Sequence, residues 1–158
     1  MRNMMNEQGF LGQIETIFKK PKGDVEREFS PYFYIYYERL FEYPQMFKAY
    51  PKTCKHIFDV TNARGKNILD IGCGFGLIAV HLAIYGAKVV SVDSSEEKIK
   101  VFEKILRSLV PPLDDVEVRL GDALELDYKD EYFDVIICNE VVSHIRDLDL
   151  LLLRRLKP

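Results

Sequence analysis

The chain has 158 residues, of which 47% are hydrophobic and 30% charged, so it has the size of one globular domain with a sizeable core. Its 22 basic and 25 acidic residues give a formal net charge of −3, without the excess of basic residues that clamps nucleic-acid phosphates. Three cysteines without a CxxC pair favour a reduced, cytoplasmic chain with neither disulfides nor a bound metal. No run of about 18 apolar residues suggests a membrane span. We therefore expect small-molecule partners, with no nucleic acid and no membrane.

The first part of the chain predicts helices. Residues 1–29 mix charges with glycine and proline, and we expect a flexible arm there. Ser30 and Pro31 have the pattern of an N-cap and a first helical residue, so helices are expected over residues 30–63. Aromatic and apolar residues at helical spacing fit either a face packed on the domain or a lid over a bound ligand. These residues are Phe33, Tyr36, Tyr37, Leu40 and Phe41.

From residue 67 onward, strands and helices are expected to alternate. Short apolar runs predict strands at residues 67–71, 87–93, 116–120 and 133–138. Helical periodicity is found at residues 77–85, 95–109 and 148–156. Ser94 and Glu97 form a capping box for the second of these helices. Nearly continuous apolar strands between helices are typical of the α/β class, with a doubly wound parallel sheet covered on both faces.

A glycine turn follows the first strand, in the sequence ILDIGCGFG at residues 68–76. Glycine permits the backbone torsions of such a turn and lets a ligand approach the backbone closely. A dinucleotide site usually has GxGxxG spacing, which places the pyrophosphate on the helix N-terminus. Here Gly72, Gly74 and Gly76 have GxGxG spacing, and Leu77 stands where the third glycine would be. The turn is either a nucleotide site of another kind or a tight connection.

Three acidic residues lie at the ends of successive strands. Asp70 is placed to reach the ammonium end of a cofactor that carries an amino acid, and it would repel a pyrophosphate. Asp93 can accept both hydroxyls of a ribose. Asp122 can accept from an adenine amino group while the amide of Ala123 donates to a ring nitrogen. Each acid alone could be a helix cap or a solvated turn residue, but three acids at one sheet edge indicate a single site.

Together these motifs resemble those of the class I methyltransferases that use S-adenosylmethionine. The resemblance covers residues 67–158, where ILDIGCGFG, VVSVD, GDALEL and FDVIICNEVVSHIRD resemble the first four motifs in order. It implies a Rossmann-like fold, with S-adenosylmethionine as cofactor and S-adenosylhomocysteine as product. It also implies a cofactor site made of Asp70, Gly72, Cys73, Gly74, Gly76, Asp93, Ser94, Asp122, Ala123, Asn139 and Glu140.

The resemblance also implies what individual residues do. Gly72 and Gly74 would pack under the methionine moiety, and Ser94 would lie beside the ribose. Asn139 would offer its backbone carbonyl to the ammonium group, with Glu140 next to it. Cys73 is interpreted as a small residue that fills the turn, not as a nucleophile.

The fourth motif bears on the methyl acceptor. Enzymes of this class that methylate the exocyclic amines of DNA or RNA bases usually have an Asn or Asp followed by prolines and an aromatic residue in this motif. CNEVVSH has neither prolines nor an aromatic residue. Arginine methyltransferases have two glutamates in the corresponding loop, and only Glu140 is present. The resemblance therefore favours a small acceptor such as a quinone, sterol, sugar or amine. His144 is either a general base or a structural histidine, while His81 and His56 are interpreted as packing or surface residues.

The family's sheet has seven strands in the order 3-2-1-4-5-7-6, whereas four are expected here, in the order 3-2-1-4. The fourth strand would then form an apolar sheet edge, which folded proteins avoid. We expect a methyltransferase domain over residues 30–158, with a cofactor-binding core at 64–158 that is incomplete at its C-terminus. Either the chain is a fragment, or a partner chain such as a second copy covers the edge. A non-catalytic cofactor-binding module and an NAD-linked oxidoreductase remain alternatives, the second disfavoured by the glycine spacing.

Overall fold

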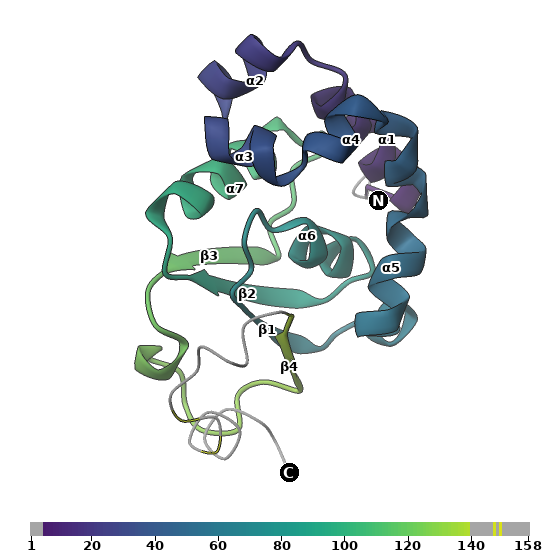
Figure 1. Ribbon diagram of the computed structural model, residues 1–158. Helices are drawn as coiled ribbons and strands as arrows, with labels where there is room; N and C mark the ends of the chain where they lie inside the picture. The colour runs from purple at the N-terminus through teal and green to yellow at the C-terminus, as the bar shows by residue number, and fades with distance from the viewer. Residues whose placement is uncertain (1–4, 140–146, 148, 150–158) are drawn as a thin grey trace.

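The computed structural model of the protein describes residues 5–139 together with residues 147 and 149. Its centre is a parallel sheet with the strand order β3-β2-β1-β4, as expected from the sequence (Figure 1). The four strands are β1 (Asn67–Ile71), β2 (Lys88–Asp93), β3 (Val116–Leu120) and β4 (Val135–Cys138). Because all four run in the same direction, their carboxyl ends share one edge of the sheet.

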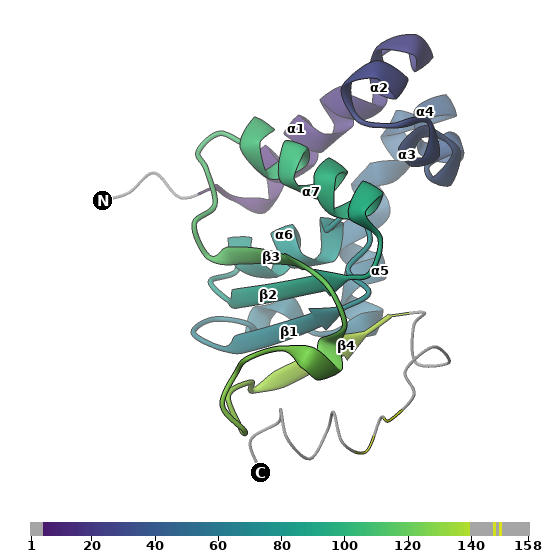
Figure 2. The ribbon, with the colours of Figure 1, turned by 90° about the vertical axis from the view of Figure 1, so that its left-hand side faces the viewer.

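The two faces of the sheet are covered differently. Helices α6 (Leu77–Ile84) and α7 (Glu96–Ser108) pack on one face, and the N-terminal helices form a further layer beyond them (Figures 1 and 2). On the other face, in the described part of the chain, apolar strand residues meet the segment after β3, which contains the 3-10 helix η3 (Ala123–Glu125). This second core consists of Leu69, Ile71, Val90, Val92, Leu126 and Phe133. The helix expected at 148–156 lies outside the described residues.

Helix α7 begins one residue later than the predicted capping box requires. Its N-cap is Ser95, whose hydroxyl accepts from the amide of Lys98 at 3.4 Å. Asp93 accepts the amide of Ser95 at 2.9 Å, and this bond turns the chain from β2 toward the helix. The Ser94 and Glu97 capping box was therefore wrong, because Asp93 already fixes the entry to the helix.

The structure also corrects the expected flexible arm. Residues 5–29 contain helices α1 (Glu7–Phe18) and α2 (Lys22–Glu28). The side-chain amide of Gln13 is bound to the backbone of Val110 twice, donating to its carbonyl at 2.7 Å and accepting from its N–H at 2.8 Å. Four α1 side chains are buried in the larger hydrophobic core, which they share with residues of α6 and α7: Phe10, Ile14, Ile17 and Phe18. This burial outweighs the charges and glycines on which the prediction of disorder was based.

The following helical region is more broken than predicted. Ser30 caps a helix as expected, accepting from the amide of Phe33 at 3.0 Å, and Pro31 is the first helical residue. The segment with apolar residues at helical spacing, residues 33–41, is divided at Tyr37 between α3 (Pro31–Tyr36) and α4 (Glu38–Glu42). Three further elements lead to β1, namely η1 (Pro44–Ala49), α5 (Tyr50–Ile57) and η2 (Val60–Asn62). None of the helices in the described ranges has the length and apolarity needed to cross a membrane.

Strand β4 lies at one edge of the described sheet. Within residues 5–139 it pairs with β1 alone, through the register Ile68 to Val135 and Ile71 to Cys138. The side chains of Val135, Ile136 and Cys138 are partly exposed. That another segment or a partner chain covers this edge stays a prediction.

Candidate cofactor site

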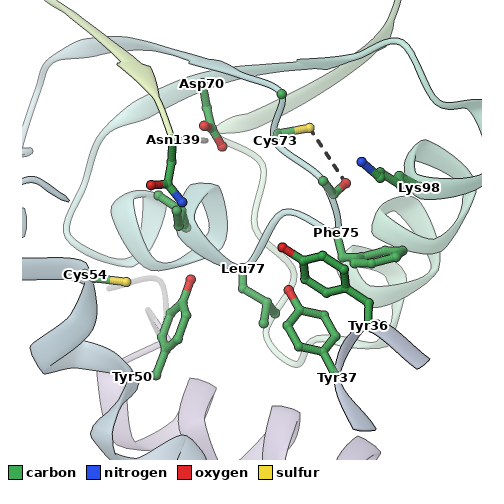
Figure 3. Close-up of a pocket in the computed structure, with 13 residues that line it drawn as sticks. Tyr36, Tyr37, Tyr50, Cys54, Asp70, Cys73, Phe75, Leu77, Lys98 and Asn139 are labelled. Atoms are coloured by element: carbon green, nitrogen blue, oxygen red, sulfur yellow. Dashed lines mark hydrogen bonds between the residues drawn. The ribbon is translucent and has the colours of Figure 1, made fainter. Parts of the chain in front are cut away.

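A pocket of about 330 Å³ lies at the carboxyl end of β1, between the glycine turn and the N-terminal helices (Figure 3). Ligands of open α/β sheets bind at this edge, where chain connections leave the sheet in opposite directions. The volume is within the usual range for small-molecule sites. Five of the predicted cofactor residues line the pocket: Asp70, Gly72, Cys73, Gly74 and Asn139.

Asp70 is the buried acid of this pocket. Its side chain is 2% exposed, and among the described residues its Oδ2 atom has no hydrogen-bond partner. Burial, reinforced by the negative charge of Asp93, raises the pKa of Asp70 to about 7. Burying a carboxyl group without a partner costs free energy, and native proteins seldom leave one unpaired. The site therefore suits a ligand with a cationic or hydrogen-bond-donating group.

Two of the three glycines in the turn serve different purposes. Gly72, Gly74 and Gly76 have φ angles of 65°, 58° and 77°, in the left-handed region that favours glycine. A Cβ atom on Gly74 would meet no described atom within 4 Å, so this glycine faces open space in the pocket. A Cβ atom on Gly76 would lie 2.0 Å from the ring of Phe102 on α7. Gly76 thus makes room for core packing, while Gly74 leaves room for a ligand.

Asp93 holds the glycine turn in place from the end of β2. Its Oδ2 accepts the amide of Gly74 at 3.0 Å, and its Oδ1 accepts the amide of Ser95. The side chain is 7% exposed and is not among the pocket-lining residues. The Nζ atom of Lys98, which does line the pocket, lies 3.9 Å from the same Oδ2.

The remaining predicted residues continue along the same edge of the sheet. The backbone N–H of Gly121 donates to the carbonyl of Asp93 at 3.1 Å, which brings the end of β3 beside that of β2. Asp122 is exposed, and its Oδ1 accepts the amide of Leu124 at 2.9 Å as the N-cap of η3. Ser94 is exposed and Ala123 begins η3. Glu140 and His144 lie outside the described residues.

The sequence left Tyr36 and Tyr37 between packing and covering a ligand, and it did not indicate Tyr50 as part of the wall opposite the glycine turn. Tyr36, Tyr37 and Tyr50 come from the N-terminal helices, and their hydroxyl groups face the pocket (Figure 3). Phe33, on the same short helix as Tyr36, is 1% exposed and packs in the core. One helix therefore contributes both a core residue and a pocket residue. A spacing of four residues places Tyr50 and Cys54 on one side of α5, but nothing local distinguishes this side from a core face.

Two tyrosines and two cysteines around the pocket have pKa values above their ordinary ones. Burial raises the pKa of the Cys54 thiol to about 11, and it raises the pKa values of Tyr37 and Tyr50 as well. Burial, with the charges of Asp70 and Asp93, also raises the pKa of Cys73. A thiol with a raised pKa is a poor nucleophile, which agrees with the interpretation of Cys73 as a turn residue.

His81 belongs to a separate polar cluster behind α6. It is fully buried, and its Nε2 lies 3.0 Å from Oε2 of Glu7 on α1. The hydroxyl of Tyr85 donates to the same oxygen at 2.6 Å. The interpretation of His81 as a packing residue is confirmed. Through these two contacts Glu7 links α1 to α6 and to its C-cap residue, Tyr85.

Comparison with known proteins decides the family. The sequence pattern of the family described as "Methyltransferase domain" matches residues 62–157. The chain belongs to this family. The family inferred from the motifs is therefore confirmed, and so is the Rossmann-like fold of this methyltransferase domain.

Two curated relatives are methyltransferases with different acceptors. The domain is 37% identical over 94 residues to norajmaline N-methyltransferase of Rauvolfia serpentina, which covers 58% of this chain. It is 35% identical over 101 residues to the ubiquinone biosynthesis O-methyltransferase of Coxiella burnetii (strain Dugway 5J108-111), which covers 61% of this chain. The chain spans 32% and 40% of the lengths of these two relatives.

A solved methyltransferase structure also matches part of the chain. Phosphoethanolamine N-methyltransferase 2 of Haemonchus contortus matches with a TM-score of 0.58 and 28% identity, over 68% of this chain and 26% of that one. That protein was solved in complex with phosphomonomethylethanolamine and S-adenosylhomocysteine.

Proposed function

We propose that this chain binds S-adenosylmethionine and forms part of an enzyme that transfers its methyl group to a small-molecule acceptor. The observation that carries the proposal is the Oδ2 atom of Asp70, which is buried beside the glycine turn without a partner in the described chain. Next to it, Gly74 leaves space where a Cβ atom would otherwise stand. A ligand with a positively charged end and a slender chain suits this combination.

Several residues would hold the cofactor. Asp70 would pair with its ammonium group, assisted by the backbone carbonyl of Asn139, and the turn from Gly72 to Gly74 would lie against its methionine chain. Asp93 and Ser94 would meet the ribose, and Asp122 and Ala123 the adenine. When bound, S-adenosylmethionine supplies a methyl group that its sulfonium already activates.

The protein's own contribution is alignment and exclusion of water. The pocket lies between the glycine turn and a wall of tyrosines, which can hold an acceptor close to the turn. A base is needed only when the attacking atom starts protonated. Burial raises the pKa values of Tyr37, Tyr50 and Cys54, so these side chains keep their protons and are unsuited to that role.

Three observations support a small acceptor. One curated relative is named norajmaline N-methyltransferase and another is named for O-methylation in ubiquinone biosynthesis, and the structural relative was solved with phosphomonomethylethanolamine. The pocket of about 330 Å³ is of small-molecule size. The net charge of −3 disfavours a polyanionic acceptor.

Isothermal titration calorimetry tests the cofactor, with S-adenosylhomocysteine in one arm and NADH in the other. We expect saturable binding of S-adenosylhomocysteine alone, lost in Asp70→Ala and kept in Asp130→Asn, which changes an exposed acid outside the pocket lining. Binding of NADH alone would favour an oxidoreductase. Transfer of a labelled methyl group to a panel of small amines, phenols and sugars then separates an enzyme from a non-catalytic binding module.

A further inference from the structure

Phe75 connects the glycine turn to the N-terminal helices. It stands between Gly74 and Gly76, and its side chain is 2% exposed. Its ring centroid lies 4.9 Å from that of Phe33, 5.5 Å from Tyr36 and 5.6 Å from Tyr37. Figure 3 shows the Phe75 ring directly beside that of Tyr36. One residue of the turn thus packs against the segment that forms the opposite wall of the pocket.

Helix α3, which carries Tyr36, is short and partly exposed. Helix α3 contains six residues, and helices of this length are unstable unless tertiary contacts support them. Ile35 and Tyr36 on it are 64% and 54% exposed, so much of its surface is not packed. Phe33 is fixed within the N-terminal layer through Phe18 and Phe41, whereas Phe75 supplies its contact with the glycine turn.

We propose that Phe75 is a positioning residue that couples cofactor binding to the placement of Tyr36 and Tyr37. When the turn is held in its binding conformation, the Phe75 ring is held too, and the two tyrosines pack against it. Because such coupling is reciprocal, a bound cofactor would favour the positions of Tyr36 and Tyr37 that form the acceptor site. The cofactor would then bind first and complete the acceptor site. This inference rests on the proposed function.

The alternative is that Phe75 is simply a core aromatic ring whose loss lowers stability. Phe133 provides the matched control, because it is 0% exposed and packs against Tyr128 and Tyr132 at 5.2 Å and 5.0 Å in the second core. Phe75→Leu and Phe133→Leu remove the same atoms from equally buried positions. A purely structural role predicts the same consequences for both.

A tryptophan placed on the wall reports its arrangement, since the chain contains none. Tyr36→Trp puts the reporter next to Phe75, and Tyr43→Trp is its control at 51% exposure, outside the pocket lining. On titration with S-adenosylhomocysteine, we expect the fluorescence of Tyr36→Trp to change saturably and that of Tyr43→Trp to stay constant. Adding Phe75→Leu should abolish this change at saturating ligand and weaken binding by about tenfold, while Phe133→Leu should preserve both.

Each outcome decides the matter. A fluorescence change that persists in Tyr36→Trp with Phe75→Leu would mean that residue 36 senses the ligand directly, and it would overturn the coupling. Equal loss of affinity in Phe75→Leu and Phe133→Leu would also overturn it. If circular dichroism shows Phe75→Leu to be unfolded, Phe75→Met, which nearly conserves volume, takes its place with the same expectations. Failure of the unmodified protein to bind in calorimetry would overturn the proposed function together with this inference.

Discussion

Replacing Asp70 with asparagine should stabilise the protein and impair its site at the same time. Burial and Asp93 raise the pKa of Asp70 from 3.8 to about 7 in the folded protein. The folded protein therefore holds this proton more tightly than the unfolded chain does. The contribution of Asp70 to stability is fully present below pH 3.8 and is lost as the pH rises toward 7. Asparagine carries no charge at any of these pH values, so Asp70→Asn avoids the loss.

The size of the effect follows from the two pKa values. Each pH unit between them corresponds to about 1.4 kcal/mol of unfolding free energy. Between about pH 4.5 and about pH 7.5, the wild-type protein should lose about 3 kcal/mol relative to Asp70→Asn. The same carboxylate would pair with the cofactor's ammonium group, so the affinity of the wild-type protein for S-adenosylhomocysteine should rise about tenfold from about pH 6 to about pH 8.

Urea unfolding monitored by circular dichroism measures this difference at each pH, and calorimetry measures the affinity. Carboxyl groups that do not interact with Asp70 titrate alike in the two proteins, so their contribution cancels in the comparison. Asp130→Asn controls for the loss of a charge at an exposed position. A stability difference that stays constant from pH 4.5 to 7.5 would refute the assignment of Asp70 as a buried carboxyl group whose ionised form destabilises the fold.

Three further substitutions follow from the packing and the hydrogen bonds. Gly76→Ala should lower the unfolding free energy by about 2 kcal/mol or more, because its Cβ would overlap the Phe102 ring, and Phe102→Leu should recover part of this loss in urea unfolding. Glu7→Ala should cost about 1 to 3 kcal/mol in thermal unfolding, because it removes the partner of His81 and Tyr85, and Glu7→Gln should cost less. Asp93→Asn loses an acceptor for one of two backbone amides and a negative charge, so it should weaken cofactor binding in calorimetry and lower the pKa of Asp70 in pH-dependent unfolding.

Local sequence was sufficient for the strands and the turn. Residues 67–71 and 116–120 are short apolar or alternating runs with clear ends, and both form strands with the predicted bounds. Ser30 and Pro31 begin a helix as predicted, because an N-cap is a contact between near neighbours. The motifs identified the family, since their order and separation are properties of the chain itself.

The N-terminal region shows where local patterns were insufficient. Gly9, Gly12 and the surrounding charges suggested an arm, yet Phe10 and Ile14 are buried against distant parts of the domain. Whether an apolar residue of a short helix is buried depends on what packs on it. The sequence alone therefore left Tyr36 and Tyr37 between packing and covering a ligand, and only the fold brings them to the glycine turn.

The residue types at the carboxyl ends of the strands can be predicted from the sequence: glycines in the turn and acids at the strand ends. What each of them does there depends on how the chain folds around it. Gly74 faces open space while Gly76 accommodates Phe102, although both have left-handed torsions. Asp70 is buried with its Oδ2 atom unpaired in the described chain, Asp93 binds the turn and Asp122 caps η3. Burial and hydrogen bonding depend on neighbours that are distant in sequence, and these neighbours set both the pKa of an acid and the space beside a glycine.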